Sequence, residues 1–175
     1  TTGGDNVAIG HNALDANTTA SNNTAVGKAA LTANTTGATN TVVGSLAMST
    51  NTTGDQNTVS GHQALKSNTT GSANVVMGLN TMYYNTTGSS NVALGRDALQ
   101  SNTTASNNTA VGTGALFANT TGIDNVAMGS GAGTALTTGS NNTAIGRVAL
   151  ATATTSSNNT AVGLSALRFT TTGAN

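Results

Sequence analysis

Very few side chains in this sequence could carry out catalysis or bind a metal ion. Its acidic residues are all Asp, Glu and Cys are absent, and there are two histidines. His11 and His62 occupy the same place in a repeated pattern, three repeats apart, which is about 14 Å if the repeats stack at strand spacing. Metal ligands must all lie within bonding distance of one ion, so these histidines cannot share a site. We therefore predict that the protein is not an enzyme and holds no metal ion or cofactor.

Three short motifs have a functional meaning in other sequences, and each has a simpler interpretation here. Gly3-Gly4-Asp5 occurs in calcium-binding nonapeptide rolls, but no nine-residue period follows it. Residues 129–133 are glycine-rich, but they lack the lysine and the strand–loop–helix setting of a phosphate-binding loop. Asn-Thr-Thr is an N-glycosylation acceptor, which in a secreted eukaryotic chain would place sugar along one edge. We favour accidental turn composition for its copies, which begin at Asn17, Asn34, Asn51, Asn68, Asn85, Asn102 and Asn119.

The whole chain is built on one 17-residue repeat without insertion or deletion. Such a strict short period is typical of solenoids, in which each repeat forms one coil stacked on the next. We number the positions of a coil from 1 to 17, beginning at its first Asn. Residues 1–5 are then the end of a preceding coil, so we interpret residues 1–175 as a single repeat array and as a piece of a longer fibre. The ten coils start at Asn6, Asn23, Asn40, Asn57, Asn74, Asn91, Asn108, Asn125, Asn142 and Asn159.

The consensus coil is N-T-A-V-G-x-x-A-L-x-x-N-T-T-G-x-N. Positions 1 to 5 alternate in residue type, which predicts a short strand with two different faces. Ala-Leu at positions 8 and 9 predicts a second short segment, and Thr-Thr-Gly-x-Asn is turn chemistry. The glycines and the Asn-Thr-Thr stretch disfavour a helix. We therefore predict an all-β fold, a parallel β-solenoid of ten coils with two or three short strands in each.

Stacking would place identical residues above one another along the rod. The Asn residues at position 1 are predicted to form a ladder, meaning a column of side chains whose amides hydrogen-bond from coil to coil. The Thr pair at positions 13 and 14 would form further columns, for which we favour a structural role over a water-ordering surface. Gly133 replaces the usual Leu or Met at position 9, so coil 8 is expected to be a weak point or a bend.

The side chains at position 4 are aliphatic or Met in nine coils. If the small residues at positions 1, 3 and 5 line a narrow interior, position 4 faces outward as a continuous apolar row, which is typical of an interface. The opposite arrangement would give a self-sufficient rod with a polar outside. We favour the first arrangement and call these residues the outer row: Ile9, Val26, Val43, Met77, Leu94, Val111, Met128, Ile145 and Val162.

Several coils carry a motif that permits comparison with known families. The five residues from Asn23 to Gly27, Asn-Thr-Ala-Val-Gly, resemble the Ser/Asn-x-Ala-x-Gly core of the β-roll in trimeric autotransporter adhesin heads. The full coil, through Asn-Thr-Thr-Gly, resembles repeats in phage tail-fibre-like and bacterial surface proteins, and this resemblance covers essentially the whole chain. It implies an extracellular fibre or stalk segment, which would belong to a cell surface, to a secreted filament or to a virion. Such a segment gives length and stiffness and self-associates, as a homotrimer or as an end-to-end filament.

Two other functions stay open. The five residues from Asn57 to Gly61, Asn-Thr-Val-Ser-Gly, resemble the core of plant ice-binding β-rolls, which implies an ice-binding rod with a Thr-rich, uncharged face. Tyr83, Tyr84, Phe117 and Phe169 all occupy positions 10 and 11, which predicts an outer edge that could bind surface carbohydrate. The net charge of zero offers no basic surface for nucleic acid, and no apolar run is long enough to insert into a membrane.

Overall fold

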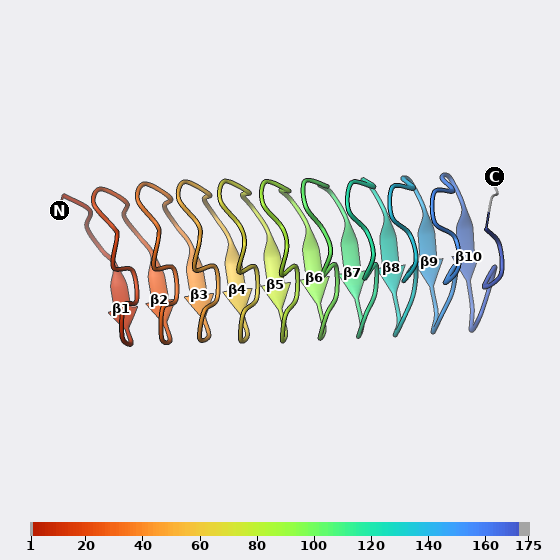
Figure 1. Ribbon diagram of the computed structural model, residues 1–175, viewed down its shortest axis with the longest axis horizontal. Coiled ribbons are helices and arrows are strands. Elements are labelled where there is room, and N and C mark those ends of the chain that lie inside the picture. The colour runs from red at the N-terminus through yellow and green to blue at the C-terminus, as the bar shows by residue number, and fades with distance from the viewer. Residues whose placement is uncertain (1, 172–175) are drawn as a thin grey trace.

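The computed structural model describes residues 2–171 and is a single stack of ten coils, each formed by one repeat (Figure 1). Every coil contributes one three-residue strand at positions 2 to 4, and the described residues contain no helix. The strands form one parallel sheet in sequence order, so the predicted all-β parallel β-solenoid is confirmed. The strands are β1 (Val7–Ile9), β2 (Thr24–Val26), β3 (Thr41–Val43), β4 (Thr58–Ser60), β5 (Val75–Met77), β6 (Val92–Leu94), β7 (Thr109–Val111), β8 (Val126–Met128), β9 (Thr143–Ile145) and β10 (Thr160–Val162).

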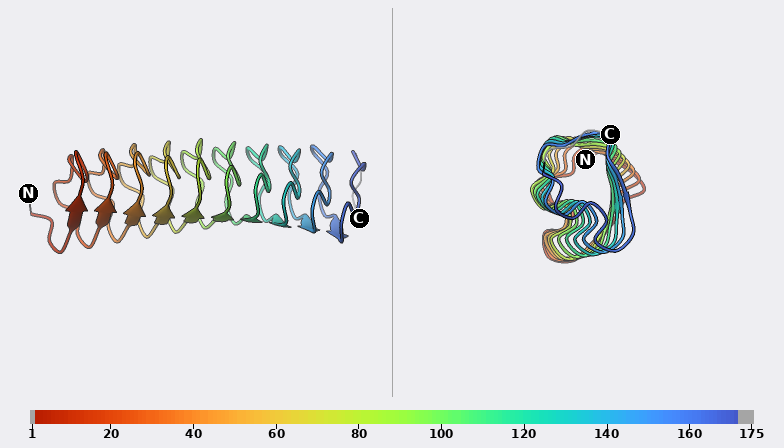
Figure 2. Two further views of the ribbon diagram at one scale, coloured as in Figure 1. Left: turned by 90° about the horizontal axis from the view of Figure 1, so that it is seen from below. Right: turned by 90° about the vertical axis from the view of Figure 1, so that its right-hand side faces the viewer.

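The 17-residue period fixes the register of the sheet. Ala25 in β2 pairs with Ala8 in β1 and with Val42 in β3, so each residue lies beside the residue one repeat away. Seen along the rod axis, successive coils lie almost over one another with a small progressive rotation (Figure 2). The described part of the chain runs from one end of the rod to the other (Figure 1). Each position in the repeat therefore becomes a column of side chains that runs the length of the molecule.

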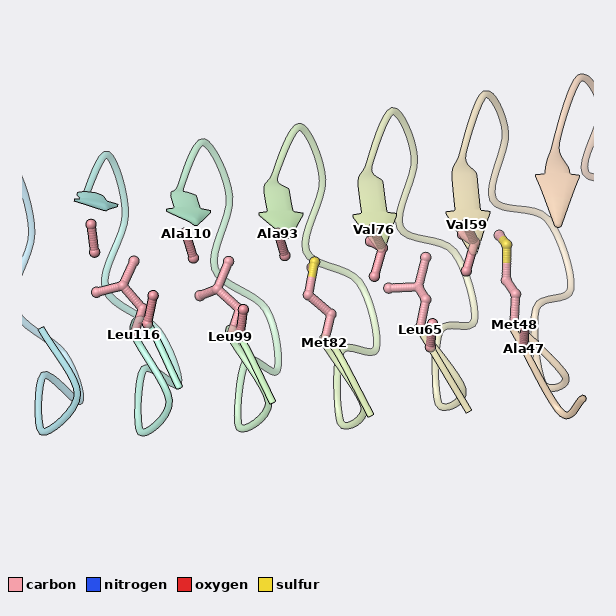
Figure 3. Close-up of a cluster of buried hydrophobic side chains, with 14 of the residues drawn as sticks. Ala47, Met48, Val59, Leu65, Val76, Met82, Ala93, Leu99, Ala110 and Leu116 are labelled. Atoms are coloured by element: carbon pink, nitrogen blue, oxygen red, sulfur yellow. The ribbon is translucent and has the colours of Figure 1, made fainter. Parts of the chain in front are cut away.

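The hydrophobic core lies between the sheet and the opposite wall of the coil. The middle residue of each strand, at position 3, points inward, and Leu or Met at position 9 points toward it from the other side (Figure 3). Val59 faces Leu65 in coil 4, and Ala93 faces Leu99 in coil 6; all four side chains are almost completely buried. Because the interior holds only one large side chain per coil, much of the remaining interior is filled by small residues.

Glycine at position 5 ends every strand because no other residue fits there. Gly27 has a φ of 135°, and a Cβ on it would lie 2.6 Å from the carbonyl carbon of Gly44 in the next coil. A side chain at this position would therefore meet both backbone strain and a backbone collision. The same close approach to the next coil occurs at the nine glycines from Gly10 to Gly146, while Gly163 in the last coil has only the positive φ, at 126°.

The expectation of two or three strands per coil is wrong, because the segment at positions 8 and 9 is a series of turns. Positions 7 and 9 are left-handed in every coil, as at Ala29 (φ 55°) and Leu31 (φ 54°). Two left-handed residues flanking one other residue prevent an extended strand. The coils still hydrogen-bond here: the N–H of Ala29 donates to His11 O at 2.8 Å, and that of Leu31 donates to Ala47 O at 3.1 Å.

Coil 8 keeps its place in the stack although Gly133 leaves position 9 without a side chain. Leu136, at position 12, where seven other coils have Asn, is fully buried and fills the space beside Gly133. A Cβ on Gly133 would lie 3.2 Å from Cδ1 of Leu136 and 2.9 Å from Cδ2 of Leu116. The sheet passes through β8 in unbroken register. Leu136 therefore compensates for the gap that the sequence predicted to be a weak point.

Candidate functional site

The position-1 asparagines are part of the rod's interior. In coil 4 the backbone N–H of Asn57 donates to Oδ1 of Asn40 at 2.9 Å. The Asn57 amide donates to the same oxygen at 3.1 Å and to Gly71 O, across its own coil, at 3.0 Å. From Asn23 to Asn159 these side chains are at most 3% exposed, while Asn6 in the first coil is half-buried. Each Asn therefore hydrogen-bonds to a neighbouring coil and across its own coil. Its polar atoms are used inside the protein and are not available to a ligand.

Position 12 forms a second buried ladder that the sequence interpretation missed. The amide of Asn68 donates to Oδ1 of Asn51 at 2.9 Å and to Gly71 O at 2.9 Å. Six of the seven residues considered as glycosylation acceptors are completely buried, so glycosylation of those six in the folded rod is excluded; they are Asn34, Asn51, Asn68, Asn85, Asn102 and Asn119. Asn17 is half-buried. The sequence did contain a signal for this second ladder: Asn recurs at position 12 in seven consecutive coils, and the run of Asn ends in coil 8, where Leu136 enters the core.

The two threonine columns face opposite ways. At position 13 the hydroxyl donates to the position-13 carbonyl of the next coil, as from Thr52 to Thr69 O at 3.0 Å. This bond is repeated through eight consecutive coils, from Thr18 to Thr137. At position 14 the threonines are exposed in all nine described coils that contain the position, Thr19 through Thr155. In coils 1 to 8 one Thr of each pair is therefore used to hold coils together, and the other faces solvent.

A third side-chain column, at position 16, was also missed. The N–H of Ser72 donates to Oγ of Ser89, and the N–H of Ser89 donates to Oγ of Ser106, both at 3.0 Å. Asp55 plays the same part for the N–H of Ala38 at 2.8 Å. Ser recurs at this position in most coils, but Ser in a turn is too common to predict a ladder by itself.

The outer row lies on the solvent side of the sheet. In β2 to β10 the middle residue is buried, and the residues at positions 2 and 4 point outward; in β1, at the end of the rod, all three residues are exposed. Val43 is 42% exposed, Met77 56% and Val162 64%. Val26, Leu94 and Val111 are half-buried. The only polar residue at position 4 is Ser60, so apolar side chains follow the sheet from β1 to β10 with one interruption.

The residues first considered for chemistry are not brought together. His11 and His62 are both exposed on the column at position 6. Among residues 2–171 no group of three or more His, Cys, Asp or Glu side chains could hold a metal ion, and this part of the molecule has no pocket. A search of the same residues found no helix with the length and apolar character needed to cross a membrane.

No protein-family model matches the chain, and comparisons with curated proteins and with solved structures found no similar protein. The interior bonding and the outer surfaces of the rod are therefore the features that bear on its function.

Proposed function

We propose that this chain is a section of an extracellular structural fibre, which supplies length and stiffness and associates with copies of itself through the outer row. The observation that carries the proposal is the outer face of the ten-strand sheet. On this face the outer row forms an almost continuous apolar surface, while other side chains already fill the interior of the rod. The expected assembly is a homotrimer with the outer rows facing one another.

The bonding between coils supports a stiff rod. Adjacent coils are joined by backbone hydrogen bonds in the sheet and in the turns, such as Leu65 N–H to Thr81 O at 2.9 Å. The ladders at positions 1 and 12 add buried side-chain hydrogen bonds between the same two coils. To bend the rod would lengthen several of these bonds on one side of a coil at the same time. A buried donor or acceptor that loses its partner costs about 1–3 kcal/mol, so bending is opposed at every coil.

The size of the outer face supports self-association. Ten strands at about 4.8 Å spacing and about 10 Å of strand length give a face of about 480 Å². This face, which the outer row shares with the residues at position 2, is within the range of about 300–600 Å² of the largest apolar patches on typical monomers, and such patches are often functional. Exposed Leu79 and Leu164, at the neighbouring position 6, widen the apolar surface further. A second and a third copy of the chain would cover it without any change in the coil.

Charge placed on the outer row tests this proposal. Asp in place of both Val43 and Val111 should convert a trimer into monomers, because each carboxylate would be desolvated in the interface. Light scattering on the purified protein gives the mass, and circular dichroism checks the fold. The matched control places Asp at Thr53 and Thr121, exposed residues of the same two coils on another face. A monomeric parent, or a trimer that survives the Val substitutions, would refute the interface.

A second candidate, an ice-binding rod, is favoured by one observation, the exposed threonine column at position 14. It offers a hydroxyl and a methyl group at each coil, with no charged residue at that position. The threonines at position 13 add little to it, because their hydroxyls donate to the next coil. Thermal hysteresis of the parent chain tests this function, and Thr70→Lys with Thr104→Lys should abolish any hysteresis that depends on the column.

A further inference from the structure

A compact aromatic and polar surface lies across coils 4 to 7, apart from the outer row. Its members occupy positions 10 and 11. Backbone bonds of 3.1 Å join the four coils at this point: Ser67 N–H to Tyr83 O, Tyr84 N–H to Gln100 O, and Ser101 N–H to Phe117 O. Lys66, Tyr83, Gln100 and Phe117 therefore follow one another at position 10, one per coil. We call these four residues and Tyr84 the aromatic patch.

The two tyrosine rings in the patch are held by their neighbours. Lys66 Nζ donates to the Tyr83 hydroxyl at 3.0 Å and lies 5.2 Å from the centre of the Tyr83 ring. The ring of Tyr84 meets that of Tyr83 edge to face, with their centres 4.7 Å apart. A ring fixed by a cation and a second ring loses little freedom when a ligand stacks on it.

Gln100, between the two aromatic coils, is also oriented. Its Nε2 donates to Oδ1 of Asp97 at 2.9 Å, and the other carboxylate oxygen of Asp97 pairs with Arg96 Nε at 3.2 Å. The side-chain amide of Gln100 has a second N–H and a carbonyl oxygen, which are a donor and an acceptor suited to hydroxyl groups. Phe117, one coil further, is 39% exposed and Tyr84 is 53% exposed.

We propose that the aromatic patch binds an extended, neutral, β-linked glycan chain that lies along the rod axis. Tyr83 and Phe117 are two coils apart, about 9.6 Å at strand spacing. Each sugar of an extended β-1,4-linked chain advances by about half that distance, so the two rings suit alternate sugars, with the intervening sugar over Gln100. Sugar rings offer apolar C–H faces to the aromatic rings, and their hydroxyls bond to Gln100. The Asp97 carboxylate is paired with Arg96 and the Lys66 ammonium donates to the Tyr83 hydroxyl, so these charged groups already have partners. The contacts left for the ligand are the aromatic rings and the Gln100 amide, which suit a neutral sugar chain. This inference does not depend on self-association through the outer row.

The sequence supplies a specific optical probe for this patch. The chain has two tyrosines and no tryptophan, so its intrinsic fluorescence comes from Tyr83 and Tyr84. Titration with cellohexaose, a β-1,4-linked glucose hexamer, should change the tyrosine emission and reach saturation. Maltohexaose, its curved α-1,4-linked counterpart, should not. Phe117→Ser should weaken cellohexaose binding at least about tenfold, which corresponds to one lost stacking contact of about 1.4 kcal/mol.

The variant is expected to fold because Ser49 occupies position 10 in coil 3, and circular dichroism checks this. Phe169→Ser, which removes an aromatic residue in coil 10, is the matched control and should bind like the parent. The proposal is overturned if cellohexaose gives no saturable change at millimolar concentration. It is also overturned if maltohexaose binds equally well, or if Phe117→Ser binds as the parent does. If Phe117→Ser lowers the mass measured by light scattering, the patch is a contact between copies and the glycan proposal fails.

Discussion

At the scale of the residue, the stack depends on amide side chains that are buried and fully used. Asn91 donates to Ala105 O at 2.9 Å and to Asn74 Oδ1 at 3.1 Å, and its own oxygen accepts the N–H of Asn108 at 2.9 Å. A buried amide that is satisfied in this way contributes little net energy as a bond, but its removal leaves the buried N–H of the next Asn without a partner. We therefore expect position 1 to tolerate no other residue.

We predict that Asn91→Ala lowers the free energy of unfolding by about 2 kcal/mol, because the buried N–H of Asn108 loses its partner, while Ala105 O keeps only the bond from Asn102. Asn91→Asp should be at least as harmful, since it keeps the shape of the side chain and loses the donor. Thr104→Ala, in the exposed column of the same coil, should change the value by less than about 0.5 kcal/mol. Urea unfolding measures all three, and equal effects of Asn91→Ala and Thr104→Ala would contradict the role of the ladder.

Two glycines in coil 7 separate backbone strain from close packing. A Cβ on Gly112, at φ 129°, would lie 2.7 Å from the carbonyl carbon of Gly129, whereas a Cβ on Gly114, at φ 65°, would meet nothing within 4 Å. We predict that Gly112→Ala costs about 3 kcal/mol or more. Gly114→Ala should cost about 1 kcal/mol, the cost of a left-handed residue, as Ala29 already stands at this position. Thermal melts compare the two, and a tolerated Gly112→Ala would disprove the packing argument.

At the scale of the element, coil 8 shows that one coil can exchange the contents of two columns. Position 9 lost its large side chain at Gly133, and position 12 gained one at Leu136. The exchange interrupts the second ladder, because Oδ1 of Asn119 is buried with no hydrogen-bond partner in the described structure. The coil keeps its core volume but gives up one buried hydrogen bond.

We predict that Gly133→Leu and Leu136→Asn compensate for each other. Gly133→Leu alone forces its side chain against Leu136 and should cost about 1–3 kcal/mol. Leu136→Asn alone leaves a gap in the core and should cost about 2–5 kcal/mol. The double variant restores the consensus, and its new amide can donate to Oδ1 of Asn119. A double-mutant cycle from urea unfolding should give a favourable coupling of at least about 2 kcal/mol, and simple additivity would contradict the exchange.

The sequence could predict an element where the residues of that element determine its structure, but not where contacts with neighbouring coils determine it. The strands were predictable because alternation at positions 1 to 5 is a local property of the sequence. The turns around position 9 were not, since Leu31 and Met48 give no sign of a left-handed backbone. There the hydrogen bonds from the coils on both sides impose the conformation, so its cause lies in stacking. The burial of Asn34 likewise depends on acceptors inside the coil, such as Gly37 O at 2.8 Å in the following turn, and the spacing of the asparagines alone does not reveal that this turn faces inward.

At the scale of the whole molecule, the rod is a one-dimensional array in which each coil contacts only its two neighbours. Stability in such an array is approximately a sum over coils and over the interfaces between them. A coil in the middle is held by two interfaces, whereas a coil at an end is held by one. Opening should therefore begin at the ends, even where the local chemistry is the same throughout.

Backbone hydrogen exchange tests this with one bond that recurs along the rod. The position-2 N–H donates to the position-1 carbonyl of the next coil at 2.8 Å in coil 1 (Val7 to Asn23), coil 6 (Val92 to Asn108) and coil 9 (Thr143 to Asn159). We predict that the Val92 amide exchanges at least about tenfold more slowly than the other two, after correction for intrinsic rates, because opening it must break two interfaces. NMR-detected exchange on the monomeric outer-row variant measures the rod without contacts between copies. Equal protection at all three amides would mean that the ten coils unfold as a single unit, in which case the interfaces between coils are strong enough to make even the end coils inseparable from the rest.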